Sequence, residues 1–210
     1  MISRSVFIML LSLPLVLSLA QNPWDEWDPD VVRELNTANK VNYLNDEEKE
    51  VILVMNMARH DGPLFVRTLL ANYVEEKQVE NSSYLRSLRK DLNNVEGLIP
   101  LQPEKDLTAA AQGHAIESGK SGRVGHQDFN KRFDPLMGNP YTHVGENCSY
   151  GYETAMDIVI SLLIDEGVKD HGHRKNILMV DFNSVGVAIR PHKTYRINCV
   201  MDYGQRKRSQ

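Results

Sequence analysis

The sequence predicts an α+β protein in which helices come first and a few strands gather near the carboxyl end. Apolar residues recur at helical spacing in several segments between residues 45 and 166. Two β-rich runs, residues 184–189 and 195–200, are joined by Pro191-His192-Lys193, which is typical of a hairpin. Because strands and helices do not alternate regularly, stacked helical and sheet layers are favoured over βαβ units.

The first 20 residues are typical of a secretory signal peptide. Arg4 gives a short positive start, and an apolar run extends from Val6 to Ala20. The run ends in the small-x-small pattern Ser18-Leu-Ala20, which predicts cleavage before Gln21. A membrane anchor is the alternative, but the run is shorter than the roughly 20 apolar residues of a spanning helix. We therefore expect a secreted, extracellular protein with no integral membrane span.

The charge balance argues against a nucleic-acid partner. The chain has 24 Lys+Arg and 28 Asp+Glu, and loss of Arg4 with the signal peptide leaves a net charge of −5. A phosphate-binding protein needs a clustered basic patch. The basic run Arg206-Lys-Arg208 is short, and residues 206–210 are expected to be a solvated tail.

Residues 21–44 are polar and irregular in pattern, with several Asp, Asn and Pro residues. We expect a mobile leader there, whose tryptophans, Trp24 and Trp27, are able to dock on the folded domain. The domain itself is predicted to extend from residue 45 to residue 205.

Helical signals fill the first half of this domain. Asn45-x-x-Glu48 resembles a capping box, and the helix that it starts is predicted to run to about Arg59. Pro63 can open the next helix. A short helix is predicted from Tyr84 to about Leu92, and the alanine-rich segment from Thr108 to Ser118 favours helix and close packing.

The second half is predicted to begin with a loop that reaches Pro140. A strand is expected from His143 to Cys148. Thr154-x-x-Asp157 caps the next helix, which Gly167 is expected to end.

Two cysteines, Cys148 and Cys199, allow one intramolecular bridge. Export would place them in an oxidising compartment, where disulfides persist. Both lie in predicted strands that could be adjacent, so a disulfide is predicted. A pair of buried thiols is the alternative.

Four side chains are candidates for a polar site: His126, Glu146, Asp165 and His173. Neutral imidazole and carboxylate are the ligands that zinc and similar divalent ions prefer. Asp165 lies near a helix C-terminus, where the helix dipole disfavours a carboxylate, so we expect it to have another partner. The four are spread over nearly fifty residues without a compact spacing, so residue type alone favours ordinary structural roles.

The loop that carries His173 also contains Arg174 and Asn176, which are expected to bind backbone carbonyls and fix it. Other reaction classes find little support. Ser149 is not in a Gly-x-Ser-x-Gly elbow, and the predicted disulfide removes Cys148 as a nucleophile. An enzyme is therefore not our first expectation.

A series of short motifs runs from Leu101 to Tyr203 in a fixed order. They are Leu101-x-Pro103, Ala109-Ala-Ala-x-x-His114-Ala115, Gly125-His126, Gly145-Glu-Asn147 with Tyr150-Gly151, Asp165-x-Gly-Val168, Gly172-His-Arg-x-Asn-Ile-Leu178, Phe182 and Val185-Gly-Val187. This order resembles the CAP superfamily of cysteine-rich secretory proteins, antigen 5 and class 1 pathogenesis-related proteins. It is most similar to the cysteine-poor, SCP-like branch that is common in bacteria.

The resemblance implies a three-layer α-β-α sandwich with a small antiparallel sheet. It also implies a cavity lined by two histidines and two acids, which holds a divalent metal in relatives. Carried over by motif, the cavity residues are His126, Glu146, Asp165 and His173. Of these, His126, Glu146 and His173 are the expected ligands of Zn²⁺ or another divalent cation.

Relatives have been linked to several activities, so the resemblance does not fix one function. We expect a secreted binding module whose cavity holds a divalent metal or a polar ligand, with a lipid, a protein or a small molecule as the extracellular partner. The alternative is a metal-dependent, protease-like hydrolase with Glu146 as general base. A third reading is a purely structural polar cluster that ties the sheet to a helix.

Overall fold

The computed structural model describes residues 24–207. The predicted signal peptide and the last three residues of the predicted tail lie outside this range. Within it, no helix combines the length and the apolar character needed to cross a membrane. The elements are α1 (Pro29–Leu35), α2 (Asp46–His60), α3 (Gly62–Phe65), the π-helix η1 (Val66–Leu70), α4 (Ala71–Glu76), α5 (Ser83–Leu92), β1 (Gln102–Pro103), α6 (Lys105–Ser121), α7 (Phe129–Phe133), β2 (Tyr141–Tyr150), α8 (Ala155–Ile164), α9 (Gly172–Ile177), β3 (Ser184–His192) and β4 (Arg196–Arg206).

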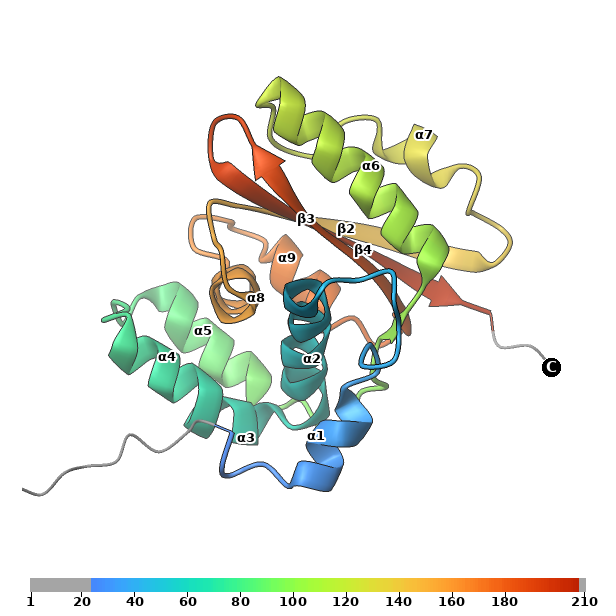
Figure 1. Ribbon diagram of the computed structural model, residues 1–210. Helices are drawn as coiled ribbons and strands as arrows, with labels where there is room; N and C mark the ends of the chain where they lie inside the picture. Colours follow the sequence, from blue (N-terminus) through green and yellow to red (C-terminus); the bar gives the residue numbers. More distant parts are fainter. Residues whose placement is uncertain (1–23, 208–210) are drawn as a thin grey trace, which may run out of the picture.

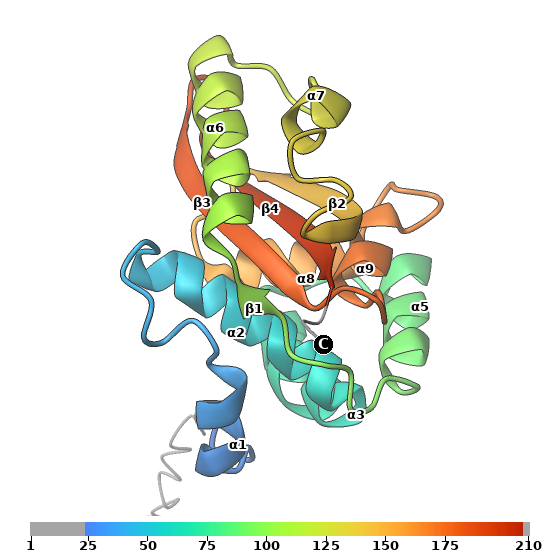
Figure 2. The ribbon, with the colours of Figure 1, turned by 90° about the vertical axis from the view of Figure 1, so that its right-hand side faces the viewer.

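Three layers make up the fold, with the sheet in the middle (Figure 1). Helix α6 and the short α7 cover one face of the sheet, and helices α2, α8 and α9 lie on the opposite side. Figure 2 shows the same arrangement from the side, with α6 running along β3. The predicted α+β class and the α-β-α sandwich are confirmed.

The sheet has the strand order β1-β3-β4-β2. Both β3 and β2 pair with β4 in antiparallel orientation. The small antiparallel sheet that was predicted is thus formed by β2, β4 and β3, and the two-residue β1 adds to β3 in parallel orientation, which makes the whole sheet mixed. Strand β2 forms the other edge, and no strand of the described chain lies beyond it.

Helix α6 packs closely on the sheet because small residues meet at the contact. A Cβ atom added to Gly186 of β3 would lie only 2.1 Å from backbone atoms of Leu107 and Thr108. Further along α6, Ala111 and Ala115 are buried in a small cluster against the sheet. The alanine-rich motif and the β3 glycine are therefore the two sides of one contact.

The predicted capping box of α2 is confirmed. The Asn45 side chain accepts a hydrogen bond from the Glu48 backbone N–H at 2.8 Å, and the Glu48 carboxylate accepts one from the Asn45 N–H at 2.9 Å. Pro63 lies in the first turn of α3, also as predicted. These signals act between near neighbours in the chain, so they can be recognised from sequence.

Arg59, near the end of α2, is a fully buried connector. Its guanidinium donates hydrogen bonds of 2.8–3.2 Å to four backbone carbonyls, those of Ile99, Ile177, Met179 and Phe182. It thereby joins the first long helix to the segment that leads from α9 into β3.

The segment predicted to be an irregular leader contains helix α1 and packs on the core. The Asp28 side chain caps this helix, and Pro29 occupies its first turn, a start signal that the sequence analysis overlooked. Trp27 is buried, and its indole N–H donates to the Thr68 hydroxyl at 3.1 Å. The predicted docking of Trp27 is thus confirmed. The prediction that residues 29–35 are irregular is wrong, because they form helix α1.

A second local difference lies between α6 and β2. The sequence predicted only a loop there, but Phe129–Phe133 form α7, with Phe133 buried.

The predicted disulfide is wrong, because Cys148 and Cys199 are free buried thiols. In the β2–β4 ladder Cys199 lies opposite Ser149, one residue away from Cys148. Successive side chains of a strand point to opposite faces, so the two thiols lie on different sides of the sheet. Cys148 packs in the cluster beneath α6, and Cys199 packs in the main core on the other face.

Candidate functional site

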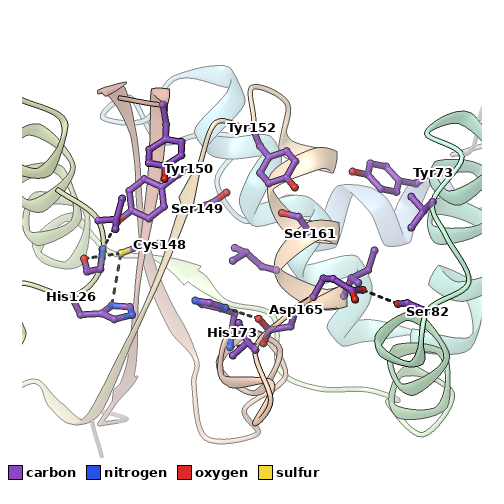
Figure 3. Close-up of a pocket in the computed structure, with 18 of the residues that line it drawn as sticks. Tyr73, Ser82, His126, Cys148, Ser149, Tyr150, Tyr152, Ser161, Asp165 and His173 are labelled. Carbon is purple, nitrogen blue, oxygen red and sulfur yellow. Dashed lines mark hydrogen bonds and ion pairs between the residues drawn. The ribbon is translucent and has the colours of Figure 1, made fainter. Parts of the chain in front are cut away.

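A cleft of about 750 Å³ opens between β2 and α8, a size typical of ligand pockets. Its walls include His126, Cys148 and Tyr150 on one side and Ser161, Asp165 and His173 on the other (Figure 3). Three of the four residues predicted for the cavity therefore line one cleft. The fourth, Glu146, is buried behind His126.

Glu146 is held by two partners that come from the segment between α6 and β2. Its carboxylate contacts His126 Nδ1 at 2.8 Å and accepts hydrogen bonds of 2.6 and 3.0 Å from the Arg132 guanidinium. Burial raises the pKa of Glu146, but these hydrogen bonds and the charge of Arg132 outweigh it and lower the pKa to about 2. Glu146 is therefore ionised at neutral pH.

This geometry fixes the tautomer of the His126 ring. An ionised carboxylate only accepts hydrogen bonds, so Nδ1 of His126 carries a hydrogen, and in the neutral ring the lone pair is on Nε2. The His126 side chain is about half exposed, at 48%. The same contacts leave Glu146 poorly suited to be a general base, because both oxygens are occupied and its pKa is far below neutral pH.

Asp165 and His173 form a second pair of the same kind. Helix α8 ends at Ile164, three residues before the predicted Gly167, because Asp165 adopts a left-handed conformation (φ 59°). One Asp165 oxygen contacts His173 Nδ1 at 2.7 Å, and the other accepts the backbone N–H of His173 at 3.0 Å. Burial raises the pKa of Asp165, but the contacts with His173 lower it overall. The expected partner of Asp165 is thus found.

The two imidazoles face each other across the cleft. Figure 3 shows the rings of His126 and His173 pointing toward one another from opposite walls. Nε2 of neither ring has a hydrogen-bond partner among residues 24–207. A histidine whose Nδ1–H is held by a carboxylate, with Nε2 free, is the usual arrangement of a metal-binding imidazole.

The loop of His173 is fixed by its own polar residues, as predicted. Arg174 is buried and donates to the carbonyls of Leu163 and Ile164 at 2.6 and 2.9 Å. Asn176 donates to the Glu146 carbonyl at 3.2 Å. Helix α9 is thereby tied both to the end of α8 and to β2, which supports the two walls of the cleft.

A compact donor group lies beneath the cleft. Atoms of His114, Glu146 and Cys148 lie within 4.8 Å of one another, close enough to hold a metal ion. Each donor is already engaged, however. His114 Nε2 lies 2.8 Å from the Gly125 carbonyl, to which it can only donate, and burial raises the pKa of the Cys148 thiol. The group therefore suits a metal less well than the two free imidazole nitrogens.

Two residues of this region were missed by the sequence analysis. Arg132 lies in a segment predicted to be a loop, and nothing local links it to Glu146. Asp202 is fully buried, and neither carboxyl oxygen has a hydrogen-bond partner in the described part of the chain. Burial, followed by the charge of Glu146, raises the pKa of Asp202 well above its ordinary value, so it is protonated. An Asp within an apolar strand was the available signal.

Comparison with known proteins places these features in a family. The profile of the Cysteine-rich secretory protein family (CAP) matches residues 83–203. YkwD of Bacillus subtilis, an uncharacterised protein, is 31% identical over 105 residues, which cover 46% of this chain and 39% of YkwD. The match thus spans about two fifths of that relative.

Two solved structures are similar at low sequence identity. The venom allergen-like protein 4 of Schistosoma mansoni is 13% identical, with a TM-score of 0.49, and the match covers 79% of this chain and 92% of that one. An outer surface protein of Borrelia burgdorferi is 18% identical, with a TM-score of 0.44, and the match covers 61% of this chain and 97% of that one.

Proposed function

The chain belongs to the Cysteine-rich secretory protein (CAP) family, and we propose that it is an extracellular binding protein whose cleft holds a divalent cation between His126 and His173. The signal-like N-terminus supports the extracellular location. Zinc is the default ion for imidazole nitrogen ligands.

The observation that carries the proposal is the matched pair of histidine–carboxylate contacts. Glu146 and Asp165 each hold one imidazole by Nδ1, so both Nε2 atoms are available in the same cleft. Glu146 then acts as an orienting group behind the ligand, whereas the sequence motif assigned it to the ligand set. Its bidentate contact with Arg132 is the reason for this change.

The charges around the cleft favour a cation. Asp165 is ionised, and Glu80 and Glu166 add exposed carboxylates to the lining. The charge of Arg132 is matched by that of Glu146. When bound, the cation would supply a Lewis-acid centre for an oxygen atom of a polar ligand. The contacts of Glu146 do not favour the hydrolase alternative.

Calorimetric titration of zinc into the metal-free protein, prepared from residue 21 without an affinity tag, tests the proposal. Replacing both His126 and His173 by Ala should abolish binding. His143→Ala is the matched control, because its ring packs against Phe182, with a centroid distance of 5.1 Å, and does not line the cleft. Equal zinc affinity in the wild type and the double variant would show that the histidines only stabilise the fold.

A further inference from the structure

The cleft runs along an open edge of the sheet. Strand β2 is an edge strand, and its residues Cys148, Ser149 and Tyr150 form part of the cleft wall. The opposite wall comes from α8 and the segment around Glu80. Figure 3 shows the β2 residues across from Ser161 of α8 and from Asp165, which follows this helix. Backbone groups on this edge therefore border a cavity.

The alternation of strand hydrogen bonds identifies which groups face outward. The Gly151 N–H donates to the Ile197 carbonyl at 3.0 Å, so residues 149 and 151 turn their backbone groups toward β4. The backbone N–H and C=O groups of Cys148 and Tyr150 then point away from β4, toward the open edge. The Asn176 amide that reaches the Glu146 carbonyl from α9 agrees with this alternation.

Asn176 occupies only the Glu146 carbonyl of this edge. Beyond it, the outward N–H and C=O groups of Cys148 and Tyr150 have no hydrogen-bond partner among residues 24–207. These two residues are separated by two positions, which is the repeat of an extended chain paired to a strand.

We propose that the outer edge of β2, at Cys148 and Tyr150, is a docking site for an extended peptide segment of another protein, which adds to the sheet as a further strand. The inference rests on the proposed role of the cleft as a binding site, but it does not require the metal. An extended peptide is the ligand class that supplies backbone donors and acceptors at the matching repeat.

The side chains around the cleft indicate the composition of this peptide. Glu80 and Glu166 line the far wall and form no ion pair with any described residue, so they would attract a basic side chain. Near the strand, Val124, Tyr152 and Tyr195 line the cleft with 48%, 43% and 45% of their surface exposed. These three would cover an apolar or aromatic side chain.

A positional-scanning library of acetylated, amidated hexapeptides provides the probe. Binding to the metal-free protein in the presence of EDTA should select Lys or Arg at one position and an apolar or aromatic residue at another. Backbone N-methylation of a selected peptide at the paired amide should weaken binding by about tenfold, as expected for lost hydrogen bonds. N-methylation at the neighbouring amide, which faces away from β2, is the matched control.

Variants of the cleft residues show how much the side chains contribute to peptide binding, separately from the backbone of β2. In the double variant Glu80→Lys/Glu166→Lys the preference should change from basic to acidic peptides. Glu34→Lys, an exposed charge reversal on α1, should leave the preference unchanged. The same peptides should bind the His126→Ala/His173→Ala variant, so loss of zinc binding and loss of peptide binding can be told apart.

Three results would overturn the peptide site. One is a library screen in which no hexapeptide with Lys or Arg binds more tightly than the same hexapeptide with an acidic residue at that position. Another is equal affinity for the N-methylated and unmodified peptides. The third is saturation of the cleft by oleate with no binding of any peptide, because a fatty acid has no amide groups to pair with the strand edge.

Discussion

Glu146 of β2 and Asp202 of β4 are directly opposite each other in the antiparallel ladder, so two carboxyl groups lie side by side beneath α6. Their environments differ. The Glu146 carboxylate has Arg132 and His126 as partners, whereas the carboxyl oxygens of Asp202 have no hydrogen-bond partner among the described residues. The pair is therefore one carboxylate and one neutral acid.

Replacement of Asp202 by Asn should stabilise the protein at neutral pH, because an amide is uncharged at every pH and does not have to be protonated to be buried. The gain should grow by about 1.4 kcal/mol for each pH unit between the unfolded and the folded pKa of Asp202. The pKa of Asp202 is raised in the folded state, so its unfavourable contribution is absent below the unfolded pKa of about 3.9 and grows as pH rises. Urea unfolding at a series of pH values checks this. Asp181→Asn, at an exposed position, is the control and should show no such trend.

Loss of Arg132 should be strongly destabilising, because Glu146 would keep its charge in a buried position. We expect Arg132→Ala to lower the free energy of unfolding by about 3 kcal/mol. Part of the loss comes from packing, since the guanidinium lies 5.7 Å from the centroid of the Phe133 ring. Arg123→Ala breaks an exposed pair with Glu117 and should cost at most about 0.5 kcal/mol. Similar losses in the two variants would contradict the assigned role of Arg132.

The protein should contain two free thiols despite its expected export. Alkylation under denaturing conditions without reductant should label both Cys148 and Cys199, and a reducing agent should leave the thermal midpoint unchanged. The reason is the opposite orientation of the two side chains in the β2–β4 ladder. A mass lower by two hydrogens in the native protein would show that this register is not the one adopted.

Replacement of Asp165 by Asn should weaken zinc binding by about 10–100-fold, because the group that orients His173 loses its charge. The pKa of Asp165 is lowered in the folded state, so its stabilising effect is present above the unfolded pKa of about 3.9 and is lost as pH falls. Calorimetry and unfolding at several pH values measure the two effects. Asp170→Asn in the same loop is exposed and should change neither.

Sequence patterns predicted those parts of the fold that depend on near neighbours in the chain. The capping box at Asn45 and the first-turn position of Pro63 were correct because each signal spans a few residues. The start of α1 has the same kind of signal, an Asp followed by Pro, but the surrounding polarity concealed it.

The contacts within the cleft could be predicted less well from sequence patterns. The family motifs located His126 and His173 in one cleft, but the contact between Arg132 and Glu146 joins a short helix to a strand and has no local pattern. The predicted disulfide was wrong for a related reason. Two cysteines in paired strands meet only if they share a face, and a shift of one residue in the register decides this.

The buried position of Arg59 sets a limit on how far the chain can be shortened. The family match begins at residue 83, after α2 has ended. A polypeptide cut to residues 83–203 would lose this guanidinium and leave four carbonyls, two of them in the interior, without their donor. It would also lose the apolar side of α2 that covers the sheet. We therefore expect such a fragment to aggregate, and the smallest autonomous folding unit to include α2.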